Sequence, residues 1–209
     1  MDNNERAARI RVMLQPKPWS AWFDGKDLTE DWSSGNFPLW MKVLAPSRDK
    51  ALSILEVGSF EGRPAIFWLE FLPNSTLTCV DHFATTKKRD GGDIERRFDA
   101  NTNVYANRLT KIKNSSASAL SRMADEKRRF DLIYIDGCHY RDEVLVDSLL
   151  AWQLLEEGGL IIFDDYEHQL ERDPAQRPKD AIDCFMGLHV DEITEVSRGY
   201  QLIIRKTRE

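Results

Sequence analysis

The sequence is most informative at residues 132–139, which read LIYIDGCH. Four apolar residues are followed there by an aspartate, a glycine and, two positions later, a histidine. The pattern returns in part at residues 160–165, LIIFDD, where an apolar run ends on two aspartates. Such runs are typical of buried strands, and parallel strands of an open sheet deliver their carboxyl ends to one ligand crevice. The side chains expected to meet in that crevice are Asp136, His139, Asp164 and Asp165.

Outside these two stretches, short apolar runs alternate with longer amphipathic stretches from residue 53 onward. The runs that predict strands are 53–57, 77–80, 111–113, 132–135, 160–163, 192–196 and 200–204. The stretches that predict helices are 64–72, 94–109, 117–125, 143–155 and 179–186, with a helix stop and turn at 157–159. This alternation predicts a doubly wound α/β fold with a mostly parallel sheet, to which the final hairpin-like pair adds an antiparallel strand.

The first 50 residues differ from the rest of the chain. They hold four of the six tryptophans, among proline, glycine, serine and aspartate residues. We expect residues 1–50 to form a helical or irregular cap on the main domain, residues 51–209, within a single compact domain. Most of these tryptophans are expected to pack within the cap. The polar stretch 167–178 directly follows Asp165 and its neighbour, and predicts an exposed loop over the site.

The composition excludes several classes of protein. A net charge of −6 argues against a broad basic surface for nucleic acid. The three cysteines lack a C-x-x-C pair, so no zinc knuckle or disulfide framework is indicated, and Cys79 and Cys138 are expected to be buried. Residues 1–11 are too polar for a signal peptide, and no apolar run approaches the roughly 20 residues of a membrane span. We therefore expect a cytoplasmic protein that binds neither nucleic acid nor membrane.

A glycine-containing turn, EVGSFEG, follows the first predicted strand at residues 56–62. Gly58 and Gly62 let backbone N–H groups approach a ligand at the start of a helix, whose dipole favours negative charge. The next predicted strand ends at Asp81, where an acid can accept hydrogen bonds from ribose hydroxyls. The alternative is that the glycines serve only a tight turn and that Asp81 caps the next segment. The coincidence of both features at adjacent strand ends favours a nucleoside-type ligand.

Together these motifs resemble those of class I S-adenosylmethionine-dependent methyltransferases. The resemblance rests on residues 53–81, 130–139 and 158–166 and on the ending GYQLIIRK. The chain is similar, over roughly residues 35–206, to the small bacterial metal-dependent O-methyltransferases of the macrocin and catechol types. It departs from their pattern in having Phe60 in place of a middle glycine and Pro64 where a small hydroxyl residue is frequent. The resemblance implies a seven-stranded Rossmann-like sheet and S-adenosylmethionine as the cofactor.

The resemblance also places other residues near the cofactor. The turn after the third predicted strand would contact the adenine through Ser115 and Ser116, which could instead only cap the next helix. The residues expected to bind the cofactor are Glu56, Gly58, Ser59, Phe60, Glu61, Gly62, Asp81, His82, Ser115, Ser116 and Asp136.

A divalent cation site formed by Asp136, Asp164 and Asp165 is implied as well. Carboxylate oxygens suit Mg²⁺ or Mn²⁺, and three converging acids without a cation would repel one another. His139 lies three residues after Asp136, where the related enzymes carry their general base. The alternatives are that the aspartate pair caps the following loop, that one of the pair lies behind the direct ligands, and that His139 is structural.

We therefore expect a metal-dependent O-methyltransferase acting on a hydroxylated small molecule, such as a sugar-bearing natural product or a catechol-like compound. The metal would lower the pKa of a substrate hydroxyl and His139 would accept its proton. His82 and His168 are expected to be solvated loop residues. Two alternatives are a methyltransferase-like partner or regulatory subunit without turnover, and an NAD-linked oxidoreductase, which the missing G-x-G-x-x-G disfavours. Small members of the group often self-associate, so a homo-oligomer is one option.

Overall fold

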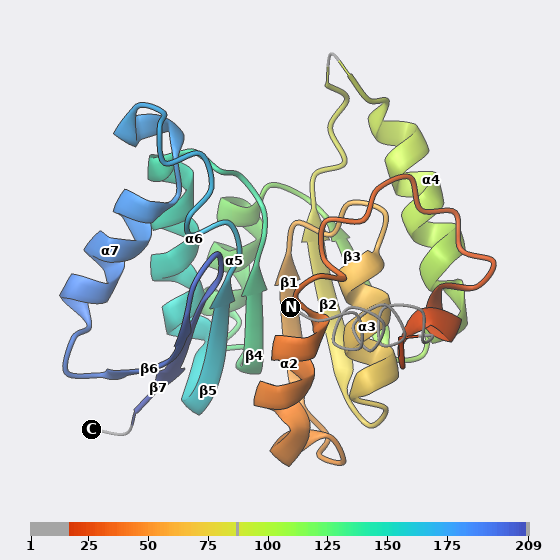
Figure 1. Ribbon diagram of the computed structural model, residues 1–209, viewed down its shortest axis with the longest axis horizontal. Helices are drawn as coiled ribbons and strands as arrows, with labels where there is room; N and C mark the ends of the chain where they lie inside the picture. Colours follow the sequence, from red (N-terminus) through yellow and green to blue (C-terminus); the bar gives the residue numbers. More distant parts are fainter. Residues whose placement is uncertain (1–16, 87, 208–209) are drawn as a thin grey trace, which may run out of the picture.

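A seven-stranded sheet forms the centre of the computed structural model, which describes residues 17–86 and 88–207 (Figure 1). The strand order is β3-β2-β1-β4-β5-β7-β6. The strands are β1 (Ser53–Val57), β2 (Thr76–Asp81), β3 (Leu109–Lys113), β4 (Phe130–Ile135), β5 (Leu155–Phe163), β6 (Ile193–Arg198) and β7 (Leu202–Lys206). Strands β1 to β5 pair in parallel, and β7 pairs antiparallel with both β5 and β6. The predicted doubly wound sheet with an antiparallel C-terminal strand is confirmed.

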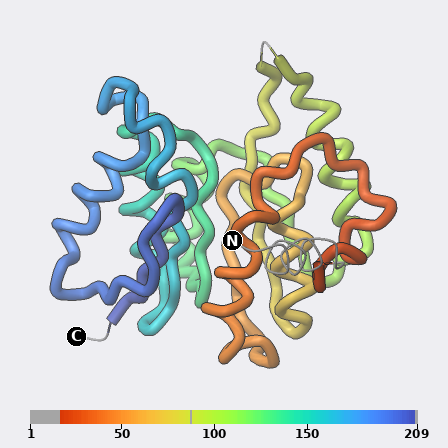
Figure 2. The backbone as a smooth tube through the Cα atoms, in the orientation of Figure 1, coloured from red at the N-terminus to blue at the C-terminus, as the bar shows by residue number. Residues whose placement is uncertain are grey.

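Helices cover both faces of this sheet, as the backbone trace also shows (Figure 2). The α-helices are α2 (Phe37–Leu44), α3 (Arg63–Phe71), α4 (Gly91–Thr102), α5 (Ser116–Asp125), α6 (Arg141–Leu154) and α7 (Lys179–Leu188). The short 3₁₀ helices are η1 (Ser20–Phe23), η2 (Ala45–Ser47), η3 (Asn103–Tyr105) and η4 (Pro174–Gln176). Helices α2, α3 and α4 share one buried apolar cluster with the sheet, and α5, α6 and α7 share the other. Burial on both faces explains why the central strands are continuous apolar runs.

The register of the central strands brings the two most informative stretches together. Ile135 of β4 pairs with Val57 of β1 on one side and with Phe163 of β5 on the other. The backbone N–H of Asp136 donates to the Val57 carbonyl at 2.8 Å, and that of Asp164 donates to the Ile135 carbonyl at 3.0 Å. The residues that follow these strands therefore leave the sheet at the same carboxyl edge.

The helix predicted over 94–109 is shorter than expected and begins earlier. Helix α4 starts at Gly91, after the side chain of Asp90 accepts hydrogen bonds from two backbone N–H groups of the first turn. It ends at Thr102, and Leu109 already belongs to β3. Asparagine and threonine side chains compete for backbone hydrogen bonds and so favour helix ends, which explains the stop within the run Asn-Thr-Asn.

The turn predicted at 157–159 is also wrong, because these residues lie within β5. The pairing of β5 with β4 shifts between Phe130 and Leu132, so one strand carries an irregularity there. Gly158 has a φ of +77°, which only glycine adopts readily, and it lets the strand continue through the irregularity.

Helix α2 of the N-terminal segment packs into the core on one face of the sheet. Trp40 is fully buried and stacks on Trp68 of α3 with ring centroids 4.4 Å apart. Phe37 stacks on Phe67 at the same centroid distance of 4.4 Å. Trp32, in contrast, is 58% exposed. Packing is therefore the role of Trp40, whereas Trp32 remains at the surface.

Two expectations about membranes concern different parts of the chain. The absence of a signal peptide is a prediction about residues 1–11, which lie outside the described residues. Within the described ranges, no helix combines the length and the apolar character that a membrane span requires.

Candidate active site

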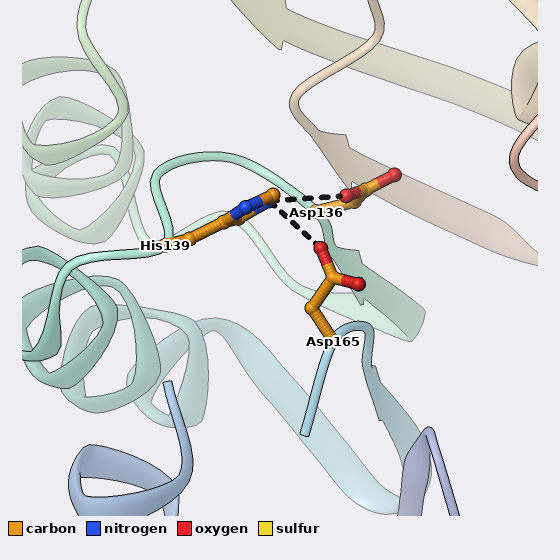
Figure 3. Close-up of side chains that lie close together, drawn as sticks. All are labelled: Asp136, His139 and Asp165. Carbon is orange, nitrogen blue, oxygen red and sulfur yellow. Dashed lines mark ion pairs between the residues drawn. The ribbon is translucent and has the colours of Figure 1, made fainter. Parts of the chain in front are cut away.

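Three side chains from two loops converge beyond the carboxyl edge of the sheet (Figure 3). Asp136 is the first residue after β4, and His139 lies in the same turn. Asp165 is the second residue after β5. The Nε2 atom of His139 lies 2.9 Å from Asp165 Oδ2 and 3.8 Å from Asp136 Oδ1. One candidate ligand atom from each residue lies within 4.8 Å of the other two. The structure thus brings together three of the four side chains that the sequence placed here.

Asp165 is held in place by its backbone and by the β6–β7 turn. Its φ of +56° lies in the left-handed region, which is uncommon outside glycine and costs roughly 1 kcal/mol or more. The Tyr200 hydroxyl donates to Asp165 Oδ1 at 2.6 Å. His168 Nδ1 lies 2.9 Å from that hydroxyl and 3.7 Å from Asp165 Oδ1. His168 lies in a loop, as expected, but its imidazole is half-buried and packs against His139, with ring centroids 5.2 Å apart.

Asp164 points away from this group of three. Its Oδ1 accepts hydrogen bonds from Gln201 Nε2 at 2.8 Å and from the Asp165 backbone N–H at 2.9 Å. Its Oδ2 lies 2.7 Å from the Tyr134 hydroxyl. Both of its oxygens therefore have partners within the protein. The arrangement corresponds to the alternative in which one member of the aspartate pair lies behind the direct ligands.

The charges of the three converging side chains depend on one another. Burial raises the pKa of Asp136 to about 7. Hydrogen bonding to the carboxylates of Asp136 and Asp165 raises the pKa of His139 to about 10. Burial opposes ionisation of Asp165, but hydrogen bonds from His139 and Tyr200 lower its pKa overall. The imidazole and the two carboxylates therefore favour one another's charged forms.

This set of donors suits a divalent cation that prefers oxygen ligands. Mg²⁺ and Mn²⁺ both suit carboxylate and water oxygens, and Mg²⁺ typically binds through one or two carboxylates and keeps several waters. Asp136 and Asp165 supply two carboxylates, and the His139 imidazole lies beside them. The two carboxylates therefore fit either ion.

Gly58 brings the loop after β1 against the turn that carries Asp136. Its φ is +84°, and a Cβ atom at this position would lie 2.0 Å from the Asp136 carbonyl oxygen. Gly62 ends the loop with a φ of +88°, and its Cβ would lie 3.0 Å from Thr102 Cγ2. Gly58 thus allows the loop to lie directly against the turn that carries Asp136, whereas Gly62 allows it to pack against α4 before α3 begins.

Asp81 anchors this loop from the end of β2. Its Oδ2 accepts hydrogen bonds from the backbone N–H groups of Ser59 and Phe60, both at 2.9 Å, and its Oδ1 accepts one from Phe83 at 2.7 Å. A carboxylate offers about four acceptor positions, so one remains for a ribose hydroxyl. His82, the next residue, has an exposed side chain.

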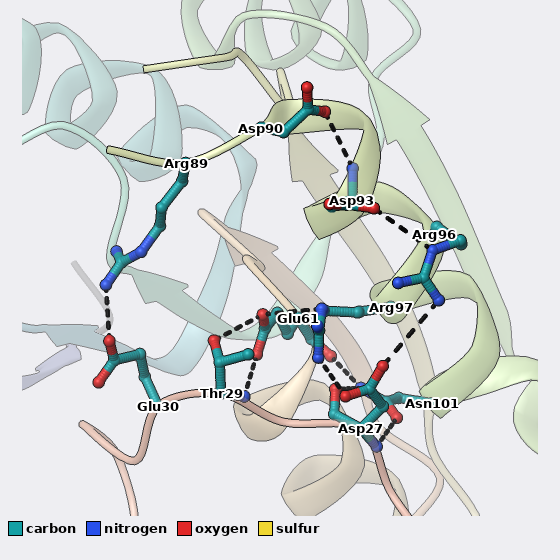
Figure 4. A network of polar contacts seen from close by, with 10 residues as sticks. All are labelled: Asp27, Thr29, Glu30, Glu61, Arg89, Asp90, Asp93, Arg96, Arg97 and Asn101. Carbon is teal, nitrogen blue, oxygen red and sulfur yellow. Dashed lines mark hydrogen bonds and ion pairs between the residues drawn. The ribbon is translucent and has the colours of Figure 1, made fainter. Parts of the chain in front are cut away.

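Glu61 connects the loop to the N-terminal segment (Figure 4). Its carboxylate accepts hydrogen bonds from the backbone N–H and the hydroxyl of Thr29 at 2.6 and 2.8 Å, and Arg97 of α4 lies 3.7 Å away. Asn101 donates to the carbonyl oxygens of Asp27 and Glu61 at 2.9 and 3.0 Å. Glu61 is 3% exposed, so these hydrogen bonds are largely shielded from water. They hold the N-terminal segment over the loop.

The serines of the predicted cofactor site have different surroundings. Ser115 is the N-cap of α5, and its hydroxyl accepts a hydrogen bond from the Ser118 backbone N–H at 3.4 Å. Ser116 is the first residue of that helix. The hydroxyl of Ser59 is buried beside the Glu56 carboxyl and the Cys79 thiol, and its hydrogen bond to Glu56 acts against the rise in pKa that burial causes there. The Ser59 side chain therefore faces the core.

Glu56, also predicted to bind the cofactor, lies wholly inside the core. Its Oε2 accepts a hydrogen bond from Trp68 Nε1 at 2.8 Å, and burial raises its pKa to about 8. The folded state therefore binds a proton more tightly than the unfolded state, so stability falls as the pH rises from about 4.5 to about 8.

Replacing Glu56 by glutamine should remove this pH dependence. From pH 5 to pH 8, the unfolding free energy of Glu56→Gln should rise relative to that of the wild type by roughly 3 kcal/mol. Urea unfolding at both pH values measures this difference. Glu126→Gln, at an exposed residue of the α5 C-terminus, serves as the control and should change by less than about 0.5 kcal/mol. Equal pH dependence in wild type and Glu56→Gln would contradict the assignment.

Three residues beside the candidate site were not identified from the sequence. Tyr134 lies within an apolar strand, where it is indistinguishable from core packing. Tyr200 and Gln201 come from the β6–β7 turn, which no sequence signal connects to β5. The one sequence signal for Tyr134 is its place in an otherwise aliphatic run. A buried tyrosine hydroxyl requires a hydrogen-bond partner, so such a tyrosine indicates a polar group nearby. Cys138, expected to be buried, is exposed because it lies in the turn beyond β4.

Comparisons with known proteins agree with this architecture. Residues 55–166 match a family model described as a methyltransferase domain. Among solved structures, an O-methyltransferase from Bacillus cereus in complex with SAH has a TM-score of 0.66 and 17% identity, covering 96% of each chain. The MycE methyltransferase of mycinamycin biosynthesis, in complex with Mg, SAH and mycinamycin VI, has a TM-score of 0.63 and 18% identity, covering 100% of this chain and 64% of that one. At these identities the likeness concerns the fold.

One curated relative is an uncharacterized protein, R132, of Acanthamoeba polyphaga mimivirus. It is 26% identical over 121 residues, which are 56% of this chain and 52% of the relative. The chain thus spans about half the length of that relative. The family model covers more than half of this chain, from β1 to just beyond β5, and includes both the glycine loop and the converging acids. The chain therefore belongs to the methyltransferase-domain family, and its resemblance to class I methyltransferases is confirmed.

Proposed function

We propose that the protein transfers a methyl group from S-adenosylmethionine to a hydroxyl group of a small molecule, with the help of a divalent cation. The observation that carries the proposal is the convergence of Asp136, His139 and Asp165 beside the glycine loop of a methyltransferase-domain chain. Two features of structural neighbours support it: the B. cereus O-methyltransferase binds SAH, and MycE binds Mg, SAH and mycinamycin VI.

The loop from Gly58 to Gly62 is the proposed cofactor cradle. Its glycines allow close approach of a ligand to the backbone. The remaining acceptor position of Asp81 would take a ribose hydroxyl. We propose Ser115 and Ser116 as the adenine contacts. The N-terminus of α5 follows β3, so these serines lie at the carboxyl edge of the sheet, as the glycine loop does.

Asp136 and Asp165 would hold the cation, and Tyr200 keeps Asp165 oriented toward it. A divalent cation bound there would lower the pKa of an acceptor hydroxyl and, through its positive charge, the pKa of His139. Nε2 of His139 faces both carboxylates and would accept the hydroxyl proton. S-adenosylmethionine bound at the glycine loop would supply the methyl group, which would pass from its sulfur to the acceptor oxygen and leave S-adenosylhomocysteine as the product.

Calorimetry with S-adenosylhomocysteine, with and without Mg²⁺, tests the proposal together with turnover on a panel of hydroxylated sugars and catechols. We expect the product to bind and turnover to require the cation. His139→Gln should retain product binding and lose about 100-fold or more in kcat.

Other outcomes of this experiment would contradict the proposal in distinct ways. Binding of NAD in place of S-adenosylhomocysteine would indicate an oxidoreductase. Cofactor binding without a metal effect and without turnover on the panel would indicate a partner or regulatory subunit. Turnover that is insensitive to a chelator would remove the cation from the mechanism.

A further inference from the structure

A chain of hydrogen bonds runs from the N-terminal helix α2 to the candidate cation site through the core. Trp40 Nε1 donates to Gln201 Oε1 at 2.7 Å, and Gln201 Nε2 donates to Asp164 Oδ1 at 2.8 Å. Asp164 Oδ2 lies 2.7 Å from the Tyr134 hydroxyl, which lies 2.9 Å from Asp136 Oδ2. The chain joins α2, the β6–β7 turn, the end of β5 and β4, which are distant in the sequence.

Three members of this chain are shielded from water, whereas Asp164 and Asp136 are half-buried at its end. Trp40 and Tyr134 are fully buried, and Gln201 is 3% exposed. The Tyr134 ring packs against Trp40 and Trp68 with centroid distances of 5.2 and 5.5 Å. Polar groups in such surroundings are costly unless they are hydrogen-bonded, so the partners hold one another in fixed orientations.

The two carboxylate oxygens of Asp136 have different partners, and this difference affects the cation site. Oδ2 is engaged by the Tyr134 hydroxyl, whereas Oδ1 is the oxygen that faces His139. The phenol carries a single hydrogen, so it donates to one carboxylate at a time and the Oδ2 atoms of Asp136 and Asp164 share it. The Oδ1 atom of Asp136 is therefore the oxygen left facing the site. Gln201 in turn fixes Asp164, and through it the position of the Tyr134 hydroxyl.

We propose that Tyr134 and Gln201 are positioning residues that set the geometry of the cation site, and that Trp40 makes helix α2 part of that arrangement. The proposal rests on the proposed function, because it assumes a cation between Asp136 and Asp165. Neither residue touches the reacting atoms. Hydrogen-bond partners of metal-binding side chains typically change metal affinity by about 10- to 100-fold when they are removed.

The test is the affinity for Mn²⁺ alone, measured by electron paramagnetic resonance of the free ion, in the wild type and in Tyr134→Phe. We expect the dissociation constant of Tyr134→Phe to rise by about 10-fold or more, with unchanged affinity for S-adenosylhomocysteine. Tyr105→Phe is the matched control. It removes a phenol–carboxylate hydrogen bond, to Glu70, from a tyrosine of similar burial outside the site, and should leave Mn²⁺ affinity unchanged.

Gln201→Met provides a second variant, since it keeps the length of the side chain and removes the amide. We expect it also to weaken Mn²⁺ binding and to raise the metal concentration needed for half-maximal rate more than it lowers kcat. If the wild type binds Mn²⁺ and both variants bind it equally well, the positioning role is overturned while the proposed function stands. If the wild type itself binds no Mn²⁺, the cation site and the positioning role are both overturned.

Discussion

Replacing Asp136 by asparagine should reduce methyl transfer to a hydroxylated acceptor by about 100-fold or more. Asparagine keeps the shape of the side chain and one carbonyl oxygen, so the turn after β4 should fold normally. It removes one of the two negative charges that would hold the cation and that now stabilise the protonated His139. Initial rates with a saturating acceptor, measured at increasing Mg²⁺, give the size of the effect.

Asp93→Asn serves as the control for this substitution. Asp93 is an exposed acid in the first turn of α4, so its replacement should change the rate less than about twofold. Full activity of Asp136→Asn in the presence of a chelator would contradict the role of this carboxylate in binding a cation.

Replacing Gly58 by alanine should destabilise the protein by at least about 3 kcal/mol. The left-handed φ of +84° costs an alanine roughly 1–2 kcal/mol by itself. In addition, the new methyl group would lie 2.0 Å from the Asp136 carbonyl oxygen, so the loop after β1 and the turn after β4 would have to separate. Urea unfolding measures the loss of stability, and the cofactor cradle and the cation site should be lost together.

Gly158→Ala separates the two contributions. Gly158 has a similar φ of +77° but no atom within 4 Å of the added Cβ. It should therefore lose only the backbone cost of roughly 1–2 kcal/mol. Equal losses of stability in the two variants would contradict the close contact between the glycine loop and the turn of Asp136.

The sequence predicted the central sheet well because its strands are buried on both faces. The runs at 53–57, 132–135 and 160–163 are continuous and apolar, and the acids and glycines after them mark the carboxyl edge. The ends of some helices and strands were less predictable, because the local sequence pattern continues past them or breaks within them. Helix α4 ends at Thr102 although amphipathic character continues, and β5 begins at Leu155 although two glycines follow.

The sequence predicted which residues the backbone brings to the candidate site, but not how their side chains are oriented there. Strand register decides that Asp136, Asp164 and Asp165 leave the sheet together. Which carboxylate turns toward His139 depends on partners that come from elsewhere in the chain. Gln201 and Tyr134 hold Asp164 in the core, and Tyr200 holds Asp165 at the site. No local pattern encodes these long-range contacts.

The most direct test is a crystal structure of the protein soaked with S-adenosylhomocysteine and Mn²⁺, with anomalous scattering used to locate the ion. We expect S-adenosylhomocysteine against the loop from Gly58 to Gly62, and one Mn²⁺ at about 2.1–2.3 Å from oxygens of both Asp136 and Asp165. Clear density for S-adenosylhomocysteine, with Mn²⁺ either absent or bound away from these two carboxylates, would contradict the proposed cation site.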